Sequence, residues 1–95
     1  MKRAIYKVPN GKLLKILLEE VEGKITILRI TGDFFMYPEE NIKSLEHFLT
    51  GCELNKEKLD AKIKEFFEKN PTQLFGVDAD SLVLTILNAN ATNEI

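Results

Sequence analysis

The stretch from residue 12 to residue 31 reads KLLKILLEEVEGKITILRIT. Two runs rich in Leu and Ile flank Glu22-Gly23, and a glycine-containing pair between such runs is typical of a β-hairpin turn. We therefore predict two antiparallel strands, over about 12–21 and 24–31. This hairpin is the framework on which the rest of the chain is placed.

Both predicted strands carry apolar residues on both of their faces. These residues are Leu13, Leu14, Ile16, Leu17 and Leu18 on the first strand and Ile25, Ile27, Leu28 and Ile30 on the second. A sheet with one face in water alternates apolar and polar residues, whereas a strand that is apolar on both faces is covered twice. Either the helices of the chain cover both faces, or another protein covers part of the sheet.

A further strand is predicted before the hairpin, because Ala4, Tyr6 and Val8 alternate with mostly polar residues. Asn10-Gly11 follows it, and both residues accept the positive φ that a two-residue type I′ turn requires. We therefore expect a three-stranded antiparallel meander with short connections.

Two amphipathic helices are predicted after the meander. The first begins at Pro38, where the missing N–H of proline is tolerated, and ends at Gly51. The second runs from its cap at Asn55 to Asn70, and Pro71 prevents its continuation.

The apolar run at 81–87 suits a buried strand as well as a helix. Because Asp78 or Asp80 offers a helix cap, we predict a third helix over about 79–88, followed by a frayed tail at 90–95. The expected fold class is therefore α+β, a three-stranded antiparallel β-meander followed by two to three helices, in one domain that spans residues 1–95.

Composition restricts the function. The net charge of −2 and the pI near 5.4 argue against nucleic-acid binding. No apolar run reaches the roughly 20 residues of a membrane span, and the N-terminus lacks the apolar core of a signal peptide. Since the single cysteine, Cys52, cannot form an internal disulfide, we expect a cytoplasmic protein that binds no membrane.

No catalytic or metal-binding constellation is evident, and we assign no catalytic and no metal-ligating residue. His47 falls on the polar side of the first helix without a nucleophile or carboxylate at a motif spacing. Cys52 has no second thiol and no obvious cation that would lower its pKa, which favours a structural thiol.

The most unusual segment is Gly32-Asp33-Phe34-Phe35-Met36-Tyr37-Pro38. It places four large side chains around a carboxylate, between a strand and a helix. The phenylalanines either plug the end of a small core or form an aromatic anchor for a partner protein.

A family resemblance rests on this segment and its surroundings. The matching residues are Lys7, Pro9, Gly11, Lys12, Leu13, Gly23-Lys24-Ile25, Ile30-Thr31-Gly32-Asp33-Phe34-Phe35, Pro38-Glu39-Glu40, Leu45-Glu46 and Leu49-Thr50-Gly51. Over almost the whole chain the sequence resembles the accessory C-terminal domain of lipoate–protein ligases, in particular the archaeal type in which that domain is a separate polypeptide. The resemblance implies a small α+β fold, related in shape to iron–sulfur scaffold and sulfur-acceptor proteins.

The resemblance also implies a function without an active site in this chain. The chain would be the non-catalytic subunit of a heterodimer, required with a large catalytic subunit for the ATP-dependent activation of lipoate to lipoyl-adenylate. The large subunit would hold ATP, magnesium and lipoate, so this chain alone would bind no cofactor. Lipoyl-acceptor domains would be indirect partners.

Two sets of site residues follow from the resemblance. Gly32, Asp33, Phe34 and Phe35 are expected at the junction with the large subunit, with Asp33 ordering the turn. The loop that carries Lys7, Gly11 and Lys12 is expected to approach the adenylate or its phosphates.

Two alternatives stay open at this point. One is a sulfur-acceptor or iron–sulfur assembly scaffold that uses Cys52, although one cysteine is too few for a four-cysteine cluster site. The other is an unrelated α+β protein-interaction domain.

Overall fold

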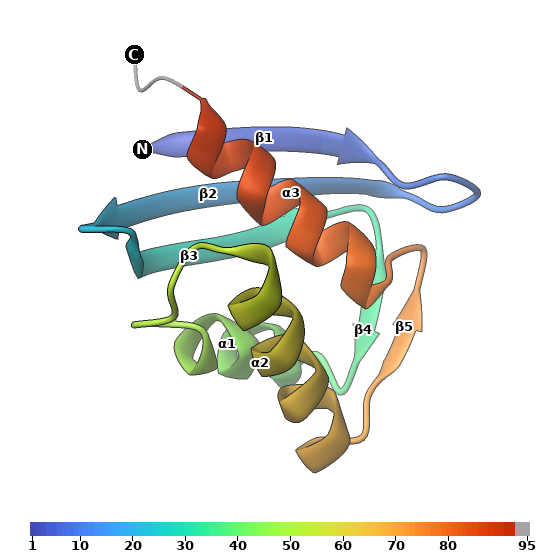
Figure 1. The fold of residues 1–95 in the computed structure, drawn as a ribbon. Coiled ribbons are helices and arrows are strands. Elements are labelled where there is room, and N and C mark those ends of the chain that lie inside the picture. The colour runs from blue at the N-terminus through green and yellow to red at the C-terminus, as the bar shows by residue number, and fades with distance from the viewer. Residues whose placement is uncertain (93–95) are drawn as a thin grey trace.

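The computed structural model describes residues 1–92 and contains the predicted meander. Strands β1 (Lys2–Lys7), β2 (Leu13–Val21) and β3 (Lys24–Gly32) form an antiparallel sheet in the order β1-β2-β3 (Figure 1). The β2–β3 turn has positive φ at both Glu22 and Gly23, as a two-residue hairpin loop demands. The expected α+β class is confirmed.

Three helices follow, and the second and third begin at the predicted caps. They are α1 (Glu40–Phe48), α2 (Lys56–Lys69) and α3 (Ala79–Ala91). The Asn55 side chain accepts a hydrogen bond from the backbone N–H of Lys58 at 2.9 Å, and the Asp78 carboxylate accepts one from Ser81 at 2.7 Å. Each bond satisfies one of the N–H groups that a helix start leaves free.

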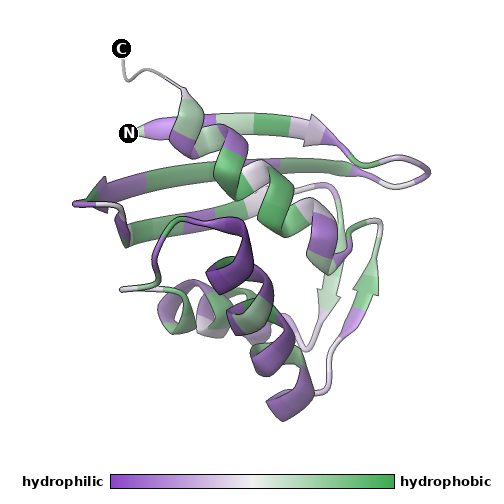
Figure 2. Cartoon of the chain, viewed as in Figure 1, coloured by the Kyte–Doolittle hydropathy of each residue, from purple (hydrophilic) through white to green (hydrophobic). Residues whose placement is uncertain are grey.

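The main core lies between the sheet and the helices. Helix α3 lies across one face of the sheet and contacts β1 and β2, while α1 packs beside β3 (Figure 1). Figure 2 shows hydrophobic residues where α3 crosses the sheet and hydrophilic ones on the visible side of α2. The largest fully buried side chains are Leu14, Ile16, Leu18, Ile25, Leu28, Met36, Leu45, Leu49, Leu59, Ile63, Leu82 and Ile86.

Only one face of the sheet is covered by the described part of the chain. Leu14, Ile16 and Leu18 are buried under α3, whereas Leu17 between them is partly exposed on the opposite face. A register shift at Glu19/Glu20 lets Ile25 and Leu28 both point into the core although they are three residues apart. Of the two explanations for the doubly apolar strands, complete coverage by the chain's own helices is therefore wrong.

The outer edge of β3 is protected by side chains and by the chain after α1. Glu46 of α1 accepts a hydrogen bond from the N–H of Ile30 at 2.7 Å, and Arg29 donates to the carbonyl of Leu28 at 3.1 Å. The backbone of Ile25 bonds to Cys52 and Gly51. These bonds occupy polar groups that an unpaired edge strand would otherwise offer to another strand.

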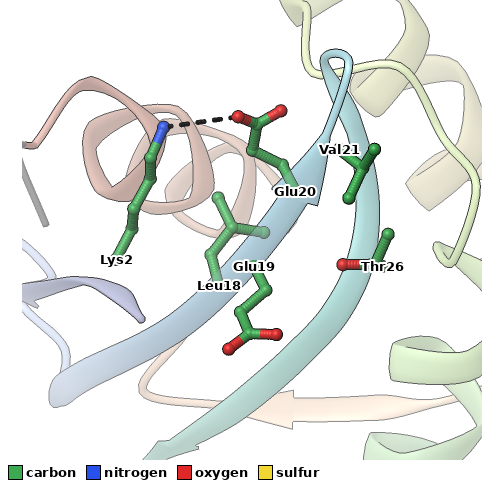
Figure 3. Close-up of a pocket in the computed structure, with 6 residues that line it drawn as sticks. All are labelled: Lys2, Leu18, Glu19, Glu20, Val21 and Thr26. Carbon is green, nitrogen blue, oxygen red and sulfur yellow. Dashed lines mark ion pairs between the residues drawn. The ribbon is translucent and has the colours of Figure 1, made fainter.

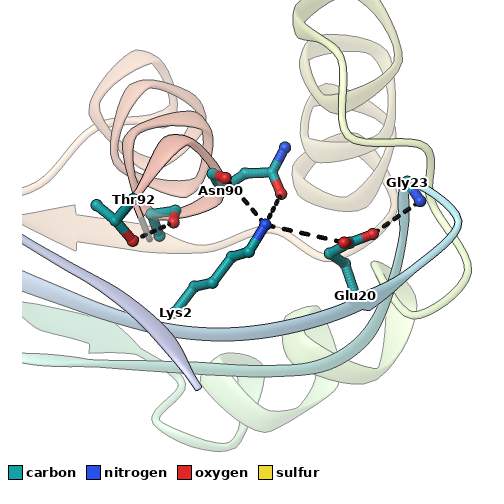
Figure 4. Close-up of polar contacts among 6 residues, drawn as sticks. Lys2, Glu20, Gly23, Asn90 and Thr92 are labelled. Atoms are coloured by element: carbon teal, nitrogen blue, oxygen red, sulfur yellow. Dashed lines mark hydrogen bonds and ion pairs between the residues drawn. The ribbon is translucent and has the colours of Figure 1, made fainter. Parts of the chain in front are cut away.

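Lys2 ties the beginning of the chain to the end of the described region. Its ammonium group donates to the carbonyl and to the side-chain oxygen of Asn90, both at 3.1 Å, and lies 3.8 Å from the Glu20 carboxylate (Figure 4). A cation at the C-terminal end of α3 is also favoured by the helix dipole. This contact fixes α3 along β1.

Several predicted boundaries are wrong. The turn after β1 is a longer loop, 8–12, with positive φ at Asn10 only, because it folds against Gly76 as described below. Residues 38–39 precede α1, whose first turn is closed by bonds from Asn41 and Ile42 to their carbonyls. Helix α3 continues through Ala91, two residues into the predicted tail, and residues 93–95 of that tail lie outside the described part of the chain.

Two short strands were not predicted at all. Strands β4 (Phe35–Tyr37) and β5 (Gln73–Phe75) pair antiparallel and form a separate two-stranded ribbon (Figure 1). None of the helices within residues 1–92 is both long and apolar enough to cross a membrane.

Candidate functional site

The β4–β5 ribbon divides its side chains between the core and the outside. Phe35 pairs with Phe75, Met36 with Leu74, and Tyr37 with Gln73. Because successive residues of a strand point to opposite sides, Met36 and Leu74 turn inward to the core. The other positions turn outward.

Three aromatic side chains gather on this outward side. The exposed fractions are 62% for Phe35, 57% for Tyr37 and 54% for Phe75. We call these three residues the aromatic face. Directly opposed residues of an antiparallel pair have Cβ atoms about 5 Å apart, so Phe35 and Phe75 are close enough to act as one anchor. Exposed rings at this density mark an interaction site more often than scattered apolar residues do.

A shallow hollow borders the aromatic face. It has a volume of about 450 Å³ and is lined by Tyr37, Pro38, Pro71, Thr72 and Gln73. The Asn41 side chain donates to the Thr72 hydroxyl at 2.8 Å, which holds the two sides of this region together. The hollow therefore has a fixed lining next to Tyr37.

Gly32 directs the chain from the sheet into this ribbon. Its φ is +148°, and a Cβ atom there would collide with the carbonyl oxygen of Leu13. The N–H of Asp33 donates to the same carbonyl at 3.0 Å. A side chain at position 32 would therefore disrupt the exit from β3.

The predicted junction residues separate into two groups. Phe34 is only 8% exposed and belongs to the core, whereas Phe35 lies on the aromatic face. Asp33 is exposed, and its backbone N–H rather than its carboxylate makes the hydrogen bond at the turn. The core interpretation is thus confirmed for Phe34, while a role of the exposed Phe35 as an anchor for a partner stays a prediction.

The loop with Lys7, Gly11 and Lys12 folds onto the segment that follows β5. The N–H of Lys12 donates to the carbonyl of Gly76 at 2.8 Å, and a Cβ atom at Gly11 would lie 2.7 Å from that oxygen. The Lys7 ammonium donates to the carbonyls of Val8 and Gly11, at 3.1 and 2.6 Å. Lys7 therefore stabilises its own loop. Both lysines are exposed, and the Lys12 ammonium makes no hydrogen bond or ion pair within residues 1–92.

His47 and Cys52 do not form a catalytic pair. His47 is exposed on α1, while Cys52 is 7% exposed and its thiol donates to the carbonyl of Glu53 at 3.4 Å. Burial raises the pKa of the Cys52 thiol, and the charge of Lys62 opposes that shift to a smaller extent. Such a thiol is a weak nucleophile at neutral pH.

Residues 1–92 contain no group of three or more His, Cys, Asp or Glu side chains placed to hold a metal ion. The candidate site is therefore sought among the exposed side chains of the described surface. The aromatic face is its most distinctive feature, so we take that face, with the hollow beside it, as the candidate site.

Sequence reasoning found Phe35 but missed the partner across the ribbon. Phe75 and Gln73 lie far along the chain from β4, and three residues are too few for a periodic pattern that would identify a strand. The signal that was available is the alternation in Gln73-Leu74-Phe75 between Pro71 and Gly76.

Comparisons with known proteins agree on one family. The model described as bacterial lipoate protein ligase C-terminus matches residues 6–84, which include β2, β3, the β4–β5 ribbon and the last two residues of β1. The protein named lipoate-protein ligase A subunit 2 from Thermoplasma acidophilum is 35% identical over 64 residues. That alignment covers 67% of this chain and 65% of the relative, so the chain matches just under two thirds of the relative's length.

A solved structure has the same fold. It superposes with a TM-score of 0.74 at 26% identity and covers 88% of this chain and 96% of its own. It comes from a structural study of an archaeal lipoylation system, described as a bi-partite lipoate protein ligase and its E2 lipoyl domain from Thermoplasma acidophilum.

Proposed function

Because this chain belongs to the family of lipoate protein ligase C-terminal domains, we propose that it is the small, non-catalytic subunit of a bipartite lipoate–protein ligase. In this proposal it forms a heterodimer with a large catalytic subunit and is required there for the ATP-dependent activation of lipoate to lipoyl-adenylate.

The observation that carries the proposal is the aromatic face. Phe35, Tyr37 and Phe75 expose large apolar surfaces on a ribbon whose other side is anchored in the core. Aromatic residues dominate the energetic centres of protein interfaces, since they bury much surface at a small entropic cost. A ribbon held by Met36 and Leu74 presents them in a preorganised geometry.

The proposed contribution to activation is positioning. ATP, magnesium and lipoate would be bound by the large subunit, where the adenylate forms. Docking of this chain would order mobile loops around that site and exclude water from the adenylate, which is how lids and accessory domains raise a rate without reacting groups of their own. Lipoyl-acceptor domains would then meet the assembled enzyme.

The exposed Lys12 gives the loop 8–12 a specific place in this proposal. A lysine ammonium is a compact cation suited to phosphate oxygens, and Lys7 is held by carbonyls of the loop. We place Lys12 near the anionic groups of the adenylate in the assembled enzyme.

Reconstitution from purified proteins tests the proposed function. Lipoyl-adenylate formation is followed with the large subunit alone, this chain alone, and the two combined. We expect product only from the combination. Equal activity of the large subunit with and without this chain would refute the requirement.

A sulfur-acceptor function receives no support from the thiol. Cys52 is buried, its pKa is raised, and it lies after α1 rather than on an exposed loop. The ligase subunit is therefore the function that the described surface supports best.

A further inference from the structure

The sheet face opposite α3 carries a mixed apolar and basic surface. We call it the open sheet face, and define it by Arg3, Ile5, Lys15, Leu17, Ile27 and Arg29. The register places Arg3, Leu17 and Arg29 in one row across the three strands. Ile5 is 64% exposed and Leu17 is 37% exposed, so an apolar strip lies among the cations in water.

This face is basic although the whole chain is acidic. It carries the three cations Arg3, Lys15 and Arg29, while the net charge of the chain is −2. Of the acidic residues on β2, Glu19 and Glu20 point to opposite sides of the strand, and Glu20 is directed toward Lys2 (Figure 3). Glu19 is thus the carboxylate that faces this side, near the β2–β3 turn.

Helix α1 extends the basic surface beyond the edge of β3. Two adjoining grooves of about 280 and 380 Å³ lie between β3 and α1, and both are lined by Arg29, Glu46 and His47. Lys43 lines the larger one. The Glu46 carboxylate accepts the N–H of Ile30 and keeps its negative charge, while Arg29 and Lys43 form no ion pair within residues 1–92.

The open sheet face continues into the aromatic face along one segment of chain. The exposed residues of this segment are Arg29, Thr31, Asp33, Phe35 and Tyr37. The buried ones are Leu28, Ile30, Phe34 and Met36. The chain turns sharply at Gly32, so the two faces are neighbours along the chain on either side of this turn.

The aromatic face alone is too small for a stable heterodimer. Specific interfaces bury about 800 Å² on each partner, contributed by some 20–30 residues. Three aromatic rings contribute a fraction of that area, since an aromatic side chain buries about 150–250 Å² when fully covered. A further contact surface is needed, and the adjoining open sheet face is the apolar surface that the described helices leave uncovered.

We propose that the open sheet face and the aromatic face form one continuous interface, and that the open sheet face receives an acidic surface with an apolar centre on the large ligase subunit. This inference rests on the proposed function and adds the location and the chemistry of the second contact. It also accounts for the apolar residues on both faces of β2 and β3, because the partner would complete the coverage.

A protein fits this face better than a nucleic acid does. Single-stranded nucleic acids are held by cations interleaved with aromatic rings on which bases stack. The open sheet face offers aliphatic Ile5, Leu17 and Ile27 instead, and the exposed rings stand on β4 and β5. Aliphatic centres with a charged rim are typical of protein interfaces.

The test measures the affinity of the large subunit for the full chain and its variants by titration calorimetry at low and high salt. Arg3→Glu/Lys15→Glu reverses two exposed cations whose side chains make no hydrogen bond or ion pair with any of residues 1–92. Ile5→Thr removes apolar surface while keeping a β-branched residue. Lys64→Glu on the exposed side of α2 is the matched charge control.

We expect the double reversal to raise Kd at least tenfold at low salt, with a smaller effect at high salt because screening weakens charge complementarity. Ile5→Thr should raise Kd several-fold at both salt concentrations, and Lys64→Glu less than twofold. Thermal melts establish that each variant is folded.

Two results separate failure of the inference from failure of the proposed function. If the wild-type chain binds and activates the large subunit while the sheet variants bind equally well, the open sheet face is not in the interface and the inference is overturned alone. If the wild-type chain neither binds nor activates the large subunit, both the proposed function and the inference are refuted. Tighter binding of a single-stranded oligonucleotide than of the large subunit would also overturn the inference.

Discussion

Phe35 and Phe75 lie directly opposite each other on β4 and β5, and both rings point away from the core. Residues from distant parts of the sequence thus converge on one exposed spot, next to Tyr37. The inward neighbours Met36 and Leu74 hold this arrangement. Exposed aromatic rings on a firmly packed ribbon are typical of surfaces that bind another protein, and the proposed function assigns them that role.

The first prediction concerns these rings. Phe35→Ala and Phe75→Ala should each weaken binding to the large subunit by about 2 kcal/mol, roughly thirtyfold in Kd, while the isolated chain keeps its melting temperature to within a few degrees. Phe34→Ala is the matched control, because it removes a core ring and should cost about 3–5 kcal/mol of stability. Melting curves and titrations of the three variants separate the two roles. A large loss of stability in Phe35→Ala with unchanged affinity would contradict the assignment.

The second prediction concerns Gly32. Gly32→Ala should lower the free energy of unfolding by ~3 kcal/mol or more, the upper end of the range for backbone strain. The reason is that the new Cβ would collide with the Leu13 carbonyl while residue 32 keeps its φ of +148°. Gly23→Ala is the control, since its Cβ would meet nothing within 4 Å and only the left-handed φ remains, at roughly 1–2 kcal/mol. Urea unfolding of both variants measures the difference. Equal losses would show that the close approach to Leu13 is unimportant.

Local sequence patterns suffice to predict several elements of this fold. The β2–β3 hairpin, the Asn55 cap and the α2 helix are local, so hydrophobic period and capping chemistry are enough to predict them. The same chemistry left Asp78 and Asp80 open as the cap of α3, and in the structure Asp78 is the cap. The prediction of a helix rather than a strand at 81–87 also depended on a local cap, and the helix is confirmed.

The features that the sequence did not reveal depend on distant contacts. The loop 8–12 takes its conformation from Gly76, and β4 exists because it meets β5. Nothing within Phe34-Phe35 indicates which ring turns inward, since that depends on the sharp exit at Gly32. The doubly apolar strands indicated a second cover, but only the fold shows which face the helices leave open.

The third prediction concerns Cys52 and pH. Burial raises the pKa of this thiol above its ordinary value of about 8.5, so the folded chain holds the proton more tightly than the unfolded chain does. Its contribution to stability is therefore fully present below about pH 8.5 and is lost as the pH rises from there through the raised pKa of the folded state. Cys52→Ala should show a smaller loss of stability than the wild type between pH 8 and pH 10.5 in urea titrations. Parallel pH profiles of the two proteins would contradict this account.

Cys52→Ala also checks the function. We expect the variant to support lipoyl-adenylate formation like the wild type when it is folded, because the thiol lies in the core. Loss of lipoate activation with a folded Cys52→Ala chain would show that the thiol takes part in the function.

The fourth prediction concerns Lys12. Lys12→Ala should lower the activation rate and the nucleotide affinity of the assembled enzyme without lowering the melting temperature of the chain, since the ammonium is exposed. Lys64→Ala, which removes an exposed cation from α2, should change neither. Unchanged kinetics in Lys12→Ala would show that the loop 8–12 has only a structural role.

The central claim is that this chain is the accessory subunit required for lipoate activation. Its most direct test is the rate of pyrophosphate release by the large subunit, with ATP, magnesium and lipoate, as purified chain is added. The account predicts a rate near zero without the chain that rises to a plateau at one chain per large subunit. A full rate before any chain is added, or a rate that no amount of chain increases, would contradict it.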